Sequence, residues 1–378
     1  MWSRCFCLVM SFCCVSAQAT AATHNYSIRF DDQLKRVFVK ADLDGYVGSI
    51  RSDSNQSSRD AQSARTCDGR GLRYRWGRLG IEQENACIRY SFELEDSTPF
   101  GRRAFTMPEG LNISSPADWL FIPRLGPDDR VNITVERPKA TAFSTPWTRV
   151  GTNTYQIGPS PGSGKALLVV GDFVREDIRV PGATLRVAIL PGAQRGKVLE
   201  WIETTAMDVA LVDGEFPNPS PQVLVVPSSN NPNGEAVPFG RVVRDRGESV
   251  HFFINPLKPQ KEYMGDWTAT HEFSHLLLPF VHSDEKWISE GFASYYQNVL
   301  LGRAGVYTEQ DAWRRLHRSF QRAQDTGGDM SPNSTAHESF WEARMMIYWS
   351  GAAIALLADV ELRKQGQSLD SVLGQLRR

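Results

Sequence analysis

Two histidines and a glutamate form the sequence "HEFSH" at residues 271–275, in a chain with seven histidines in total. Residues four apart lie on one face of an α-helix, so the imidazoles of His271 and His275 can reach the same metal ion. Glu272 follows one position later and therefore leans toward the open side of that ion. Zinc lowers the pKa of a bound water toward ~7, and a nearby carboxylate can accept its proton. The spacing therefore predicts a Zn²⁺ site with Glu272 as a general base.

A third ligand is expected on a second helix. Pro279 should end the first helix, and "HSDE" at 282–285 is typical of a new helix start. Glu290 lies on this second helix, with fourteen residues between it and His275. Two helices joined by a short turn pack antiparallel, so Glu290 can face back onto the metal. His282, on the expected loop, is the alternative third ligand.

"HEFSH" followed by "WISEGFASYYQ" at 287–297 resembles the gluzincin metallopeptidases. The sequence is most similar to the glycyl aminopeptidase family and, more distantly, to the aminopeptidase N and leukotriene hydrolase family. Their third-ligand helix is similar to "EGFASYY" at 290–296. The segment "IYWSGAAIALLADVELRKQGQSLDSVL" at 347–373 resembles the part of these enzymes where Tyr-x-x-Gly places a tyrosine beside the scissile carbonyl. The resemblance is specific from about 266 to 375 and loose before that.

The resemblance implies that His271, His275 and Glu290 bind zinc. Glu272 would be the general base and then the proton donor, and Tyr348 would donate a hydrogen bond to the developing oxyanion. It also implies a thermolysin-like catalytic domain behind an N-terminal β domain, and a peptide or protein substrate, with aminopeptidase activity as the first expectation. From the residues alone, the preferred interpretation of Tyr348 is an amphipathic tyrosine at a helix surface.

Two features depart from these families. The segment between His275 and Glu290 is shorter than is usual in these families, so the loop over the site must be shorter as well. The upstream Gly-rich motif whose Glu holds the substrate's free amine is not present. In the corresponding stretch at 239–256, Glu248 follows Gly247 and is either an amine anchor or a solvated turn residue. An endopeptidase of the same fold and a catalytically silent peptide-binding protein therefore remain open alternatives.

The same stretch carries a small basic cluster. Arg241, Arg244 and Arg246 lie beside an expected edge strand. By default they belong to a solvated loop and pair with Asp245 and Glu248. The alternative is that they contact a substrate carboxylate.

Short strands are expected from residue 24 to about 190. The runs "RVFVKADL" at 36–43, "CIRYSFEL" at 87–94 and "VNITVE" at 131–136 are β-branched or aromatic, and Gly, Pro, Asp and Asn separate such runs. Repeated strands without helices predict a β-sandwich-like domain. A third functional hypothesis follows, in which this part is an adhesion or carbohydrate module and the helical part is incidental.

The second half has a different pattern. Apolar residues at helical spacing occur at 197–212, and strand-like runs occur at 222–229 and 249–256. "PFGRVVRDRGES" at 238–249 has the composition of a loop, and from Asp266 onward the chain is mostly helical. The sequence therefore predicts an α+β protein with three parts. These are a signal peptide at 1–19, a β-rich domain at 20–180, and a mainly helical, thermolysin-like zinc-peptidase domain at 181–378.

The first nineteen residues have the pattern of a signal peptide. Arg4 is followed by an apolar run at 5–16, too short to span a bilayer, and then by Ala17-Gln18-Ala19, where a signal peptidase would cut. We therefore expect a secreted or periplasmic protein. A lipid anchor on Cys14 is the minor alternative. No later apolar run of ~18 residues is evident, so no transmembrane segment is expected after signal removal.

The cysteine count and the net charge give further expectations about the class of protein. Four of the six cysteines leave with the signal peptide, and Cys67 and Cys87 remain. In an oxidising compartment these two most simply form one disulfide, with two buried free thiols as the alternative. A net charge of -1 gives no electrostatic case for nucleic acid, and 41% hydrophobic residues with ten Trp argue against disorder.

Overall fold

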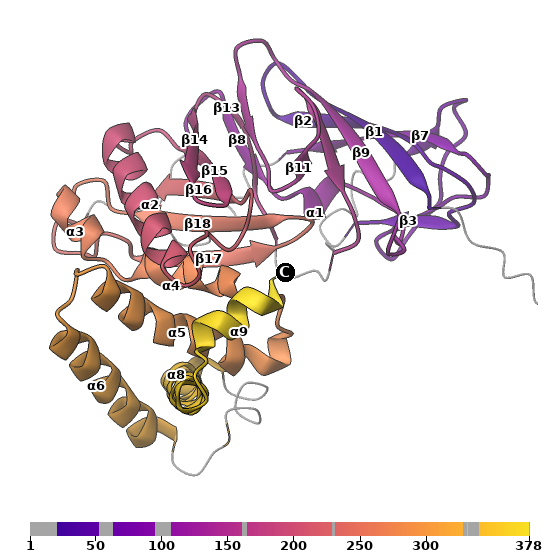
Figure 1. Cartoon of the computed structure of the whole chain (residues 1–378). Helices are drawn as coiled ribbons and strands as arrows, with labels where there is room; N and C mark the ends of the chain where they lie inside the picture. The colour runs from indigo at the N-terminus through magenta and orange to yellow at the C-terminus, as the bar shows by residue number, and fades with distance from the viewer. Residues whose placement is uncertain are drawn as a thin grey trace, which may run out of the picture.

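The computed structural model describes residues 21–52, 63–94, 107–160, 165–228, 231–327, 331 and 340–377. The expected signal peptide at 1–19 and the alternative lipid anchor on Cys14 lie outside these residues. Figure 1 shows the order of the described parts: a twisted sheet of N-terminal strands at one end, a second sheet in the middle, and C-terminal helices below it. The fold is therefore mixed, with strands and helices in largely separate regions.

A seven-stranded sheet forms the N-terminal end. Its strands, in spatial order, are β11 (Thr148–Arg149), β12 (Thr154–Ile157), β9 (Arg130–Glu136), β1 (Thr23–Phe30), β2 (Arg36–Asp42), β7 (Cys87–Glu93) and β4 (Arg65–Thr66). Neighbours are antiparallel except β1 and β9, which are parallel. Strands β2 and β7 cover two of the runs expected from the sequence, 36–43 and 87–94.

Two small sheets complete this region. One contains β3 (Ser49–Arg51), β6 (Arg78–Gly80) and β5 (Tyr74–Arg75), and the other contains β10 (Ala142–Ser144), β13 (Leu168–Gly171) and β8 (Leu111–Ser114). Alternate residues of the large sheet, such as Ile28, Val39 and Ile88, share one buried cluster with Leu79 of the first small sheet and Val170 of the second. The alternation arises because successive side chains of a strand point to opposite faces.

The predicted disulfide is confirmed. It joins Cys67 to Cys87, with 5.4 Å between their Cα atoms. Cys87 is the first residue of β7, so the link fixes the loop after β4 to the edge of the large sheet.

The central five-stranded sheet has the order β14 (Val174–Val180), β15 (Ala183–Ile189), β16 (Gln222–Pro227), β18 (Glu248–Ile254) and β17 (Phe239–Arg244). The strands β15, β16 and β18 are parallel, and the two outer strands are antiparallel to their neighbours. The helix α2 (Arg195–Ala210) connects β15 to β16, as a parallel pair requires. The prediction of a loop at 238–249 is wrong for residues 239–244, because they form the edge strand β17.

Both faces of this central sheet are covered. Val223 and Val225 of β16 share a buried cluster with residues of α2 and with Ala269 and Phe273, whereas Leu224 and Val226 pack with the sheet that contains β8 and β13. A strand buried on both faces has a continuous apolar sequence, as "QVLVVP" has. The expected domain boundary at 180/181 falls in the turn between β14 and β15, which pair along their whole length. The domain division itself stays a prediction.

The remaining elements are mostly helical. They are α1 (Pro116–Trp119), α3 (Gln260–Met264), α4 (Thr268–Ser274), the 3₁₀ turns η3 (His275–Leu277) and η4 (Ser283–Glu285), α5 (Lys286–Arg303), α6 (Glu309–Gly327), α8 (Phe340–Lys364) and α9 (Leu369–Leu376). In Figure 1 the helices α5, α6, α8 and α9 lie together below the central sheet. The helical pattern expected from Asp266 onward is confirmed for these described residues.

One helix bears on the expectation about membranes. Within Ala343–Lys364 of α8, an 18-residue segment has a mean hydropathy of 1.4, so this helix is long and apolar enough to cross a membrane by length and composition. About one third of that segment, 33%, is buried inside the protein. The expected absence of any membrane-spanning segment is therefore not confirmed.

Candidate metal centre

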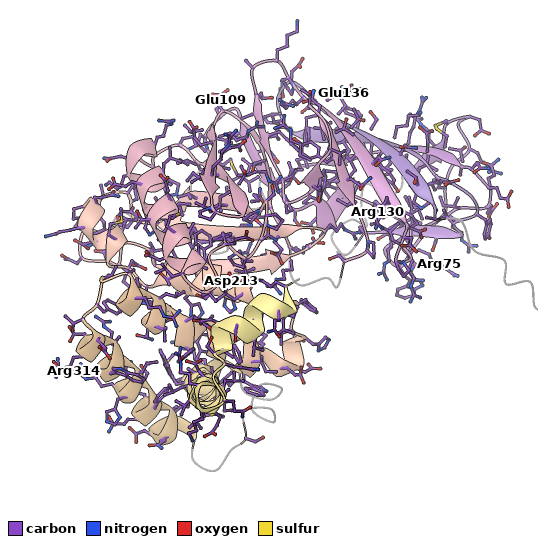
Figure 2. The ribbon with its side chains drawn as sticks, viewed as in Figure 1. Arg75, Glu109, Arg130, Glu136, Asp213 and Arg314 are labelled. Atoms are coloured by element: carbon purple, nitrogen blue, oxygen red, sulfur yellow. A yellow bond between two sulfur atoms is a disulfide. The ribbon has the colours of Figure 1, made fainter. Side chains whose placement is uncertain are left out.

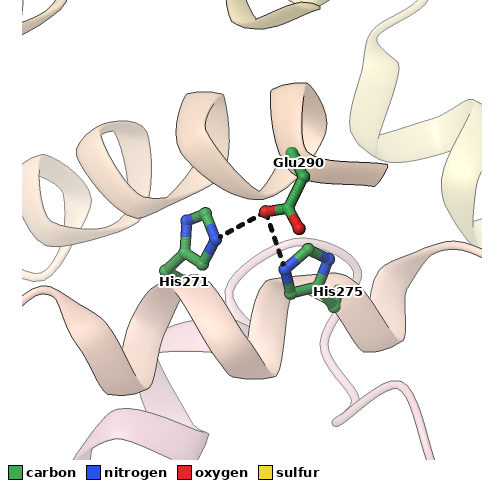
Figure 3. Close-up of side chains that lie close together, drawn as sticks. All are labelled: His271, His275 and Glu290. Carbon is green, nitrogen blue, oxygen red and sulfur yellow. Dashed lines mark hydrogen bonds and ion pairs between the residues drawn. The ribbon is translucent and has the colours of Figure 1, made fainter. Parts of the chain in front are cut away.

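Three side chains meet between α4 and α5. The two helices run side by side, and Glu290 of α5 points down between His271 and His275, as Figure 3 shows. Oε2 of Glu290 lies 3.3 Å from Nε2 of His271 and 3.4 Å from Nε2 of His275. The donor atoms of the three residues all lie within 4.8 Å of one another. The structure therefore brings together the three ligands predicted from the sequence.

Each imidazole is oriented by a further partner on α5. Nδ1 of His271 lies 2.8 Å from Oε1 of Gln297, and Nδ1 of His275 lies 2.9 Å from Oγ of Ser289. The amide oxygen of Gln297 only accepts hydrogen bonds, so Nδ1 of His271 carries the proton and Nε2 presents its lone pair. A partner on the second nitrogen is the usual way to fix a metal-binding histidine.

The donor set fits zinc. Two nitrogens and one carboxylate oxygen are the ligands of many catalytic zinc sites, which leave a fourth position open. Ligands about 2.0–2.2 Å from a tetrahedral ion lie roughly 3.3–3.6 Å from each other. The separations of 3.3 and 3.4 Å between Glu290 and the two imidazoles agree with that geometry. The types of these three residues and their separations therefore fit a Zn²⁺ ion.

Glu272 lies on the side of α4 that contacts the edge strand β17. A Cβ atom at Gly240 of β17 would be 2.5 Å from Cγ of Glu272 and 3.0 Å from Thr268. Any side chain at position 240 would therefore displace Glu272. The backbone N–H of Val242, two residues along the same strand, donates a hydrogen bond to the Glu272 carboxylate. The edge strand thus fixes the predicted base without contributing a side chain of its own.

The C-terminal end of the metal helix is also held by β17. Nη2 of Arg244 donates to the carbonyl oxygens of His275 and Leu278, each at 2.8 Å. Its Nε lies 3.1 Å from Glu248, which also accepts a hydrogen bond from Asn218. The last carbonyls of a helix lack partners within the helix, and a cation is favourable there. The side chain of Arg244 is only 12% exposed, so the prediction that Arg244 belongs to a solvated loop is wrong.

Tyr348 of α8 lies directly against the cluster of His271, His275 and Glu290. Its ring stacks on His271 with centroids 5.8 Å apart and an angle of 3° between the planes. Its hydroxyl donates a hydrogen bond to Glu290, and burial together with that carboxylate raises the pKa of Tyr348 well above its usual range. The hydroxyl therefore stays protonated and is a hydrogen-bond donor beside the metal site.

The position of Tyr348 depends on a close helix crossing. A Cβ atom at Gly351, one turn after Tyr348, would collide with the Trp287 carbonyl and would lie 2.8 Å from Cα of Gly291. A Cβ atom at Gly291 would collide with the backbone of Gly351. The absence of side chains at Gly351 and Gly291 thus brings α8 directly against the residue that follows Glu290.

The two buried carboxylates have opposite pKa shifts. Burial raises the pKa of Glu272 above its ordinary value, although the nearby imidazoles act in the other direction. Burial also disfavours the charged form of Glu290, but His275 and His271 outweigh it and hold the pKa of Glu290 well below its usual range. Environments that separate the pKa values of neighbouring groups are typical of catalytic sites. Glu290 suits a permanently charged ligand, and Glu272 suits a group that exchanges a proton.

The alternative ligand lies outside the cluster. The side chain of His282 is 67% exposed and its Nδ1 lies 3.0 Å from Asp284. Gln297 and Ser289 were not predicted from the sequence. Gln297 follows Glu290 by seven residues, which is two helical turns on the same face, so the spacing contained a signal for it. Arg244 and Gly240 carried no such signal, because their role depends on where β17 packs.

Comparison with known proteins adds to this geometry. Residues 267–354 match the model of the M61 glycyl aminopeptidase family. The structure is similar to an aminopeptidase N family protein from Idiomarina loihiensis, with a TM-score of 0.62 and 14% identity over 94% of this chain and 70% of the other. It is also similar to a mutant M1 zinc metallopeptidase from Deinococcus radiodurans bound to a Tyr-Ser-Ala substrate, with a TM-score of 0.54 and 13% identity over 94% of this chain and 84% of the other. No curated protein was found to match the sequence.

These findings bear on the fold and on the class of enzyme. At 14% and 13% identity the two solved structures show the fold, which is mixed and aminopeptidase-like. The segment that matches the family model contains every predicted site residue: His271, Glu272, His275, Glu290 and Tyr348. The predicted resemblance to the gluzincin peptidases is confirmed, and the matches support a metallopeptidase hydrolase.

Proposed function

We propose that this metallopeptidase hydrolyses peptide bonds with one zinc ion bound by His271, His275 and Glu290. The observation that carries the proposal is the convergence of the three donor atoms within 4.8 Å, with Nδ1 of each imidazole already engaged elsewhere. We also propose that the ion lies in a thermolysin-like catalytic domain from about 181 onward, behind a β-rich domain at 20–180. Secretion or export to the periplasm, expected from residues 1–19, is part of the same proposal.

The chain's own residues have distinct roles in this reaction. Zinc, when bound, would activate a water molecule and polarise the scissile carbonyl. Glu272 would accept the proton of the attacking water and pass it to the leaving amine. The Tyr348 hydroxyl would turn from Glu290 to the carbonyl oxygen as negative charge develops there. Gly240 and Val242 would hold Glu272 in reach of both protons.

The choice between aminopeptidase and endopeptidase rests on different evidence. Aminopeptidase activity is supported by the family model and by the aminopeptidase-like fold. Against it, Glu248, the candidate amine anchor, is already engaged by Arg244 and Asn218. Endopeptidase cleavage is therefore the second candidate, and the two are separated by comparing peptides with free and acetylated N-termini. Loss of cleavage on acetylation supports an aminopeptidase, and equal cleavage supports an endopeptidase.

The deciding experiment is the metal content of the mature protein, purified without added metal and measured by mass spectrometry. We expect about one zinc per chain, lost in Glu290→Ala and retained in Glu285→Ala, because a site with two histidines and one carboxylate needs all three ligands. Glu285 is an exposed carboxylate on the same connection and serves as the matched control. A wild-type protein that takes up no zinc even when zinc is offered contradicts the proposal. A protein that binds zinc but cleaves no peptide in a library would be the silent peptide-binding alternative.

A further inference from the structure

A groove lies on the outer face of the seven-stranded sheet, on strands that do not contribute to the metal site. Its lining comes from β1, β2, β4, β7 and the end of β9, and its volume is about 460 Å³. Four cations line it: Arg29, Lys40, Arg65 and Arg89. A volume of this size is within the range of about 300–1,000 Å³ typical of small-molecule sites. The groove therefore has the size for a ligand and a marked charge.

Three of the cations lie directly opposite one another. Lys40 of β2 is the partner of Arg89 of β7, and Arg89 is in turn the partner of Arg65 of β4. Opposite residues in antiparallel strands have Cβ atoms about 4.5–5.5 Å apart, and like charges at that distance are destabilising. The row is therefore unfavourable for the free protein and favourable once an anion lies across it.

The arginines of the groove make no ion pair with any acid that the structure describes, although Glu136 of β9 lies directly opposite Arg29. Among the residues that the structure describes, no carboxylate lies within ion-pair distance of Arg29, Arg65 or Arg89. Arg29 lies over the ring of Phe38, 4.2 Å from its centroid, and Lys40 pairs with Asp42 at 2.8 Å. The lining contains one acid, Glu136. Because the whole chain has a net charge of -1, this local excess of positive charge is not a consequence of a basic composition.

We propose that this groove binds an acidic oligosaccharide, one that carries carboxylate or sulfate groups along its chain. Guanidinium groups bind such anions in a bidentate manner, and the hydroxyls of Ser27 and Ser91 in the lining suit the hydroxyl groups of a sugar.

Other polyanions fit the groove less well. The groove lies on a sheet face, so an acidic peptide could not add to it through main-chain hydrogen bonds as it would at an edge. Stacked nucleic-acid bases need exposed aromatic rings, whereas Tyr90 is buried and Phe38 lies under Arg29.

The chain offers a matched control surface. Arg75 and Arg78 are opposite partners on β5 and β6, and Arg73 lies just before them, but none of the three lines the groove. Figure 2 shows Arg75 well separated from Glu136, which marks the groove. Replacing Arg73, Arg75 and Arg78 with Gln removes as much charge as replacing Arg29, Arg65 and Arg89. A difference between the two triple variants therefore reports the groove and not the net charge.

The test measures binding of labelled probes to the full-length mature protein by fluorescence anisotropy at about 50 mM salt. The probes are an oligogalacturonate, a sulfated heparin fragment, a neutral maltooligosaccharide and poly-glutamate of similar length. We expect at least one of the two acidic sugars to bind at least about tenfold more tightly than the neutral sugar and poly-glutamate. We also expect R29Q/R65Q/R89Q to weaken that binding by about tenfold or more, and R73Q/R75Q/R78Q to change it by less than about twofold. Circular dichroism and thermal melting check that both variants are folded.

Three results would overturn the proposal. Equal weakening in the two triple variants would mean that binding is general attraction to positive charge. Tighter binding of poly-glutamate than of the acidic sugars would mean that the surface recognises acidic peptides. Binding of no probe would mean that the groove is not a polyanion site. None of these outcomes would contradict the proposed peptidase activity. Zinc content and peptide cleavage are measured separately, and both should be unchanged in the two variants.

Discussion

The metal centre and the groove on the N-terminal sheet both gather charged side chains, but they support them in opposite ways. At the metal centre each polar group has a second partner from another element, such as Gln297 for His271 and the Val242 N–H for Glu272. In the groove, Arg29, Arg65 and Arg89 are exposed, and none of them forms an ion pair with an acid in the part of the chain that the structure describes. The first arrangement fixes geometry before a ligand arrives, which catalysis requires. The second leaves side chains free to adapt, which suits recognition of charge on a variable polymer.

The largest effect should come from the base. We expect Glu272→Gln to lower kcat/KM by about 10²–10⁴, because the amide cannot accept a proton from water. Zinc content should be unchanged, since Glu272 is not among the three clustered donors. The measurement pairs steady-state kinetics with metal analysis on the same sample. Loss of zinc in this variant would mean that Glu272 supports the metal and is not the base.

The next effect concerns the tyrosine on α8. We expect Tyr348→Phe to lower kcat by about 10²–10³ with little change in KM, because one hydrogen bond to the developing oxyanion is lost. The phenyl ring can still stack on His271, so zinc should remain bound. Wild-type turnover in this variant would remove Tyr348 from the mechanism and return it to a packing role.

A smaller effect should follow from removing the hydrogen-bond acceptor of one proposed zinc ligand. We expect Gln297→Leu to weaken zinc affinity by about 10–100-fold, because the acceptor that fixes the tautomer of His271 is removed. Gln297→Glu keeps an acceptor and should restore most of the affinity. Zinc competition with a fluorescent chelator measures both variants. Equal weakening in the two would show that Gln297 only fills space.

A further prediction concerns Asp208 of α2, a carboxylate outside the metal centre. Asp208 is half-buried in the last turn of α2, and burial raises its pKa to about 6. The folded state then holds its proton more tightly than the unfolded chain, so the charged form costs stability as pH rises from the ordinary carboxyl pKa through about 6.

We therefore expect Asp208→Asn to raise stability at pH 8 by about 1 kcal/mol after allowance for partial exposure, and to have little effect at pH 4. Denaturant unfolding at the two pH values measures this. A stabilisation that is the same at both would mean that it does not arise from the charge.

The smallest effect is expected at Arg89, which lies between Lys40 and Arg65 on the sheet. We expect Arg89→Gln to stabilise the protein by at most about 0.5 kcal/mol at low salt, because two like-charge neighbours are relieved. The gain should vanish at about 1 M salt, where the Debye length is near 3 Å. Arg36→Gln is the control, since Arg36 pairs with Glu93 and should give no gain. Clear destabilisation by Arg89→Gln would show that the row is compensated within the protein.

What the sequence could predict was local. His271, His275 and Glu290 were found because ligand spacing on two consecutive helices is a short-range property, and Cys67 and Cys87 because two cysteines leave one pairing. The edge strand β17 was missed in part, since "PFGRVVRDRGES" has the composition of a loop and its strand conformation comes from pairing with β18. The contacts of Gly240 with Glu272 and of Arg244 with the end of α4 are tertiary, so no local pattern indicated them.

The glycine contact between α5 and α8 links two parts of the proposed chemistry. Gly291 is adjacent to Glu290, and Gly351 lies one turn from Tyr348, so the crossing fixes the distance between the proposed metal ligand and the proposed oxyanion donor. Neither helix can slide along the other without changing the distance from Glu290 to Tyr348. The helix α8, with about a third of its apolar segment buried, is in this way packed against the helix that carries the proposed ligand Glu290. Whatever contacts the exposed side of α8 would therefore be in a position to tune catalysis from outside the cleft.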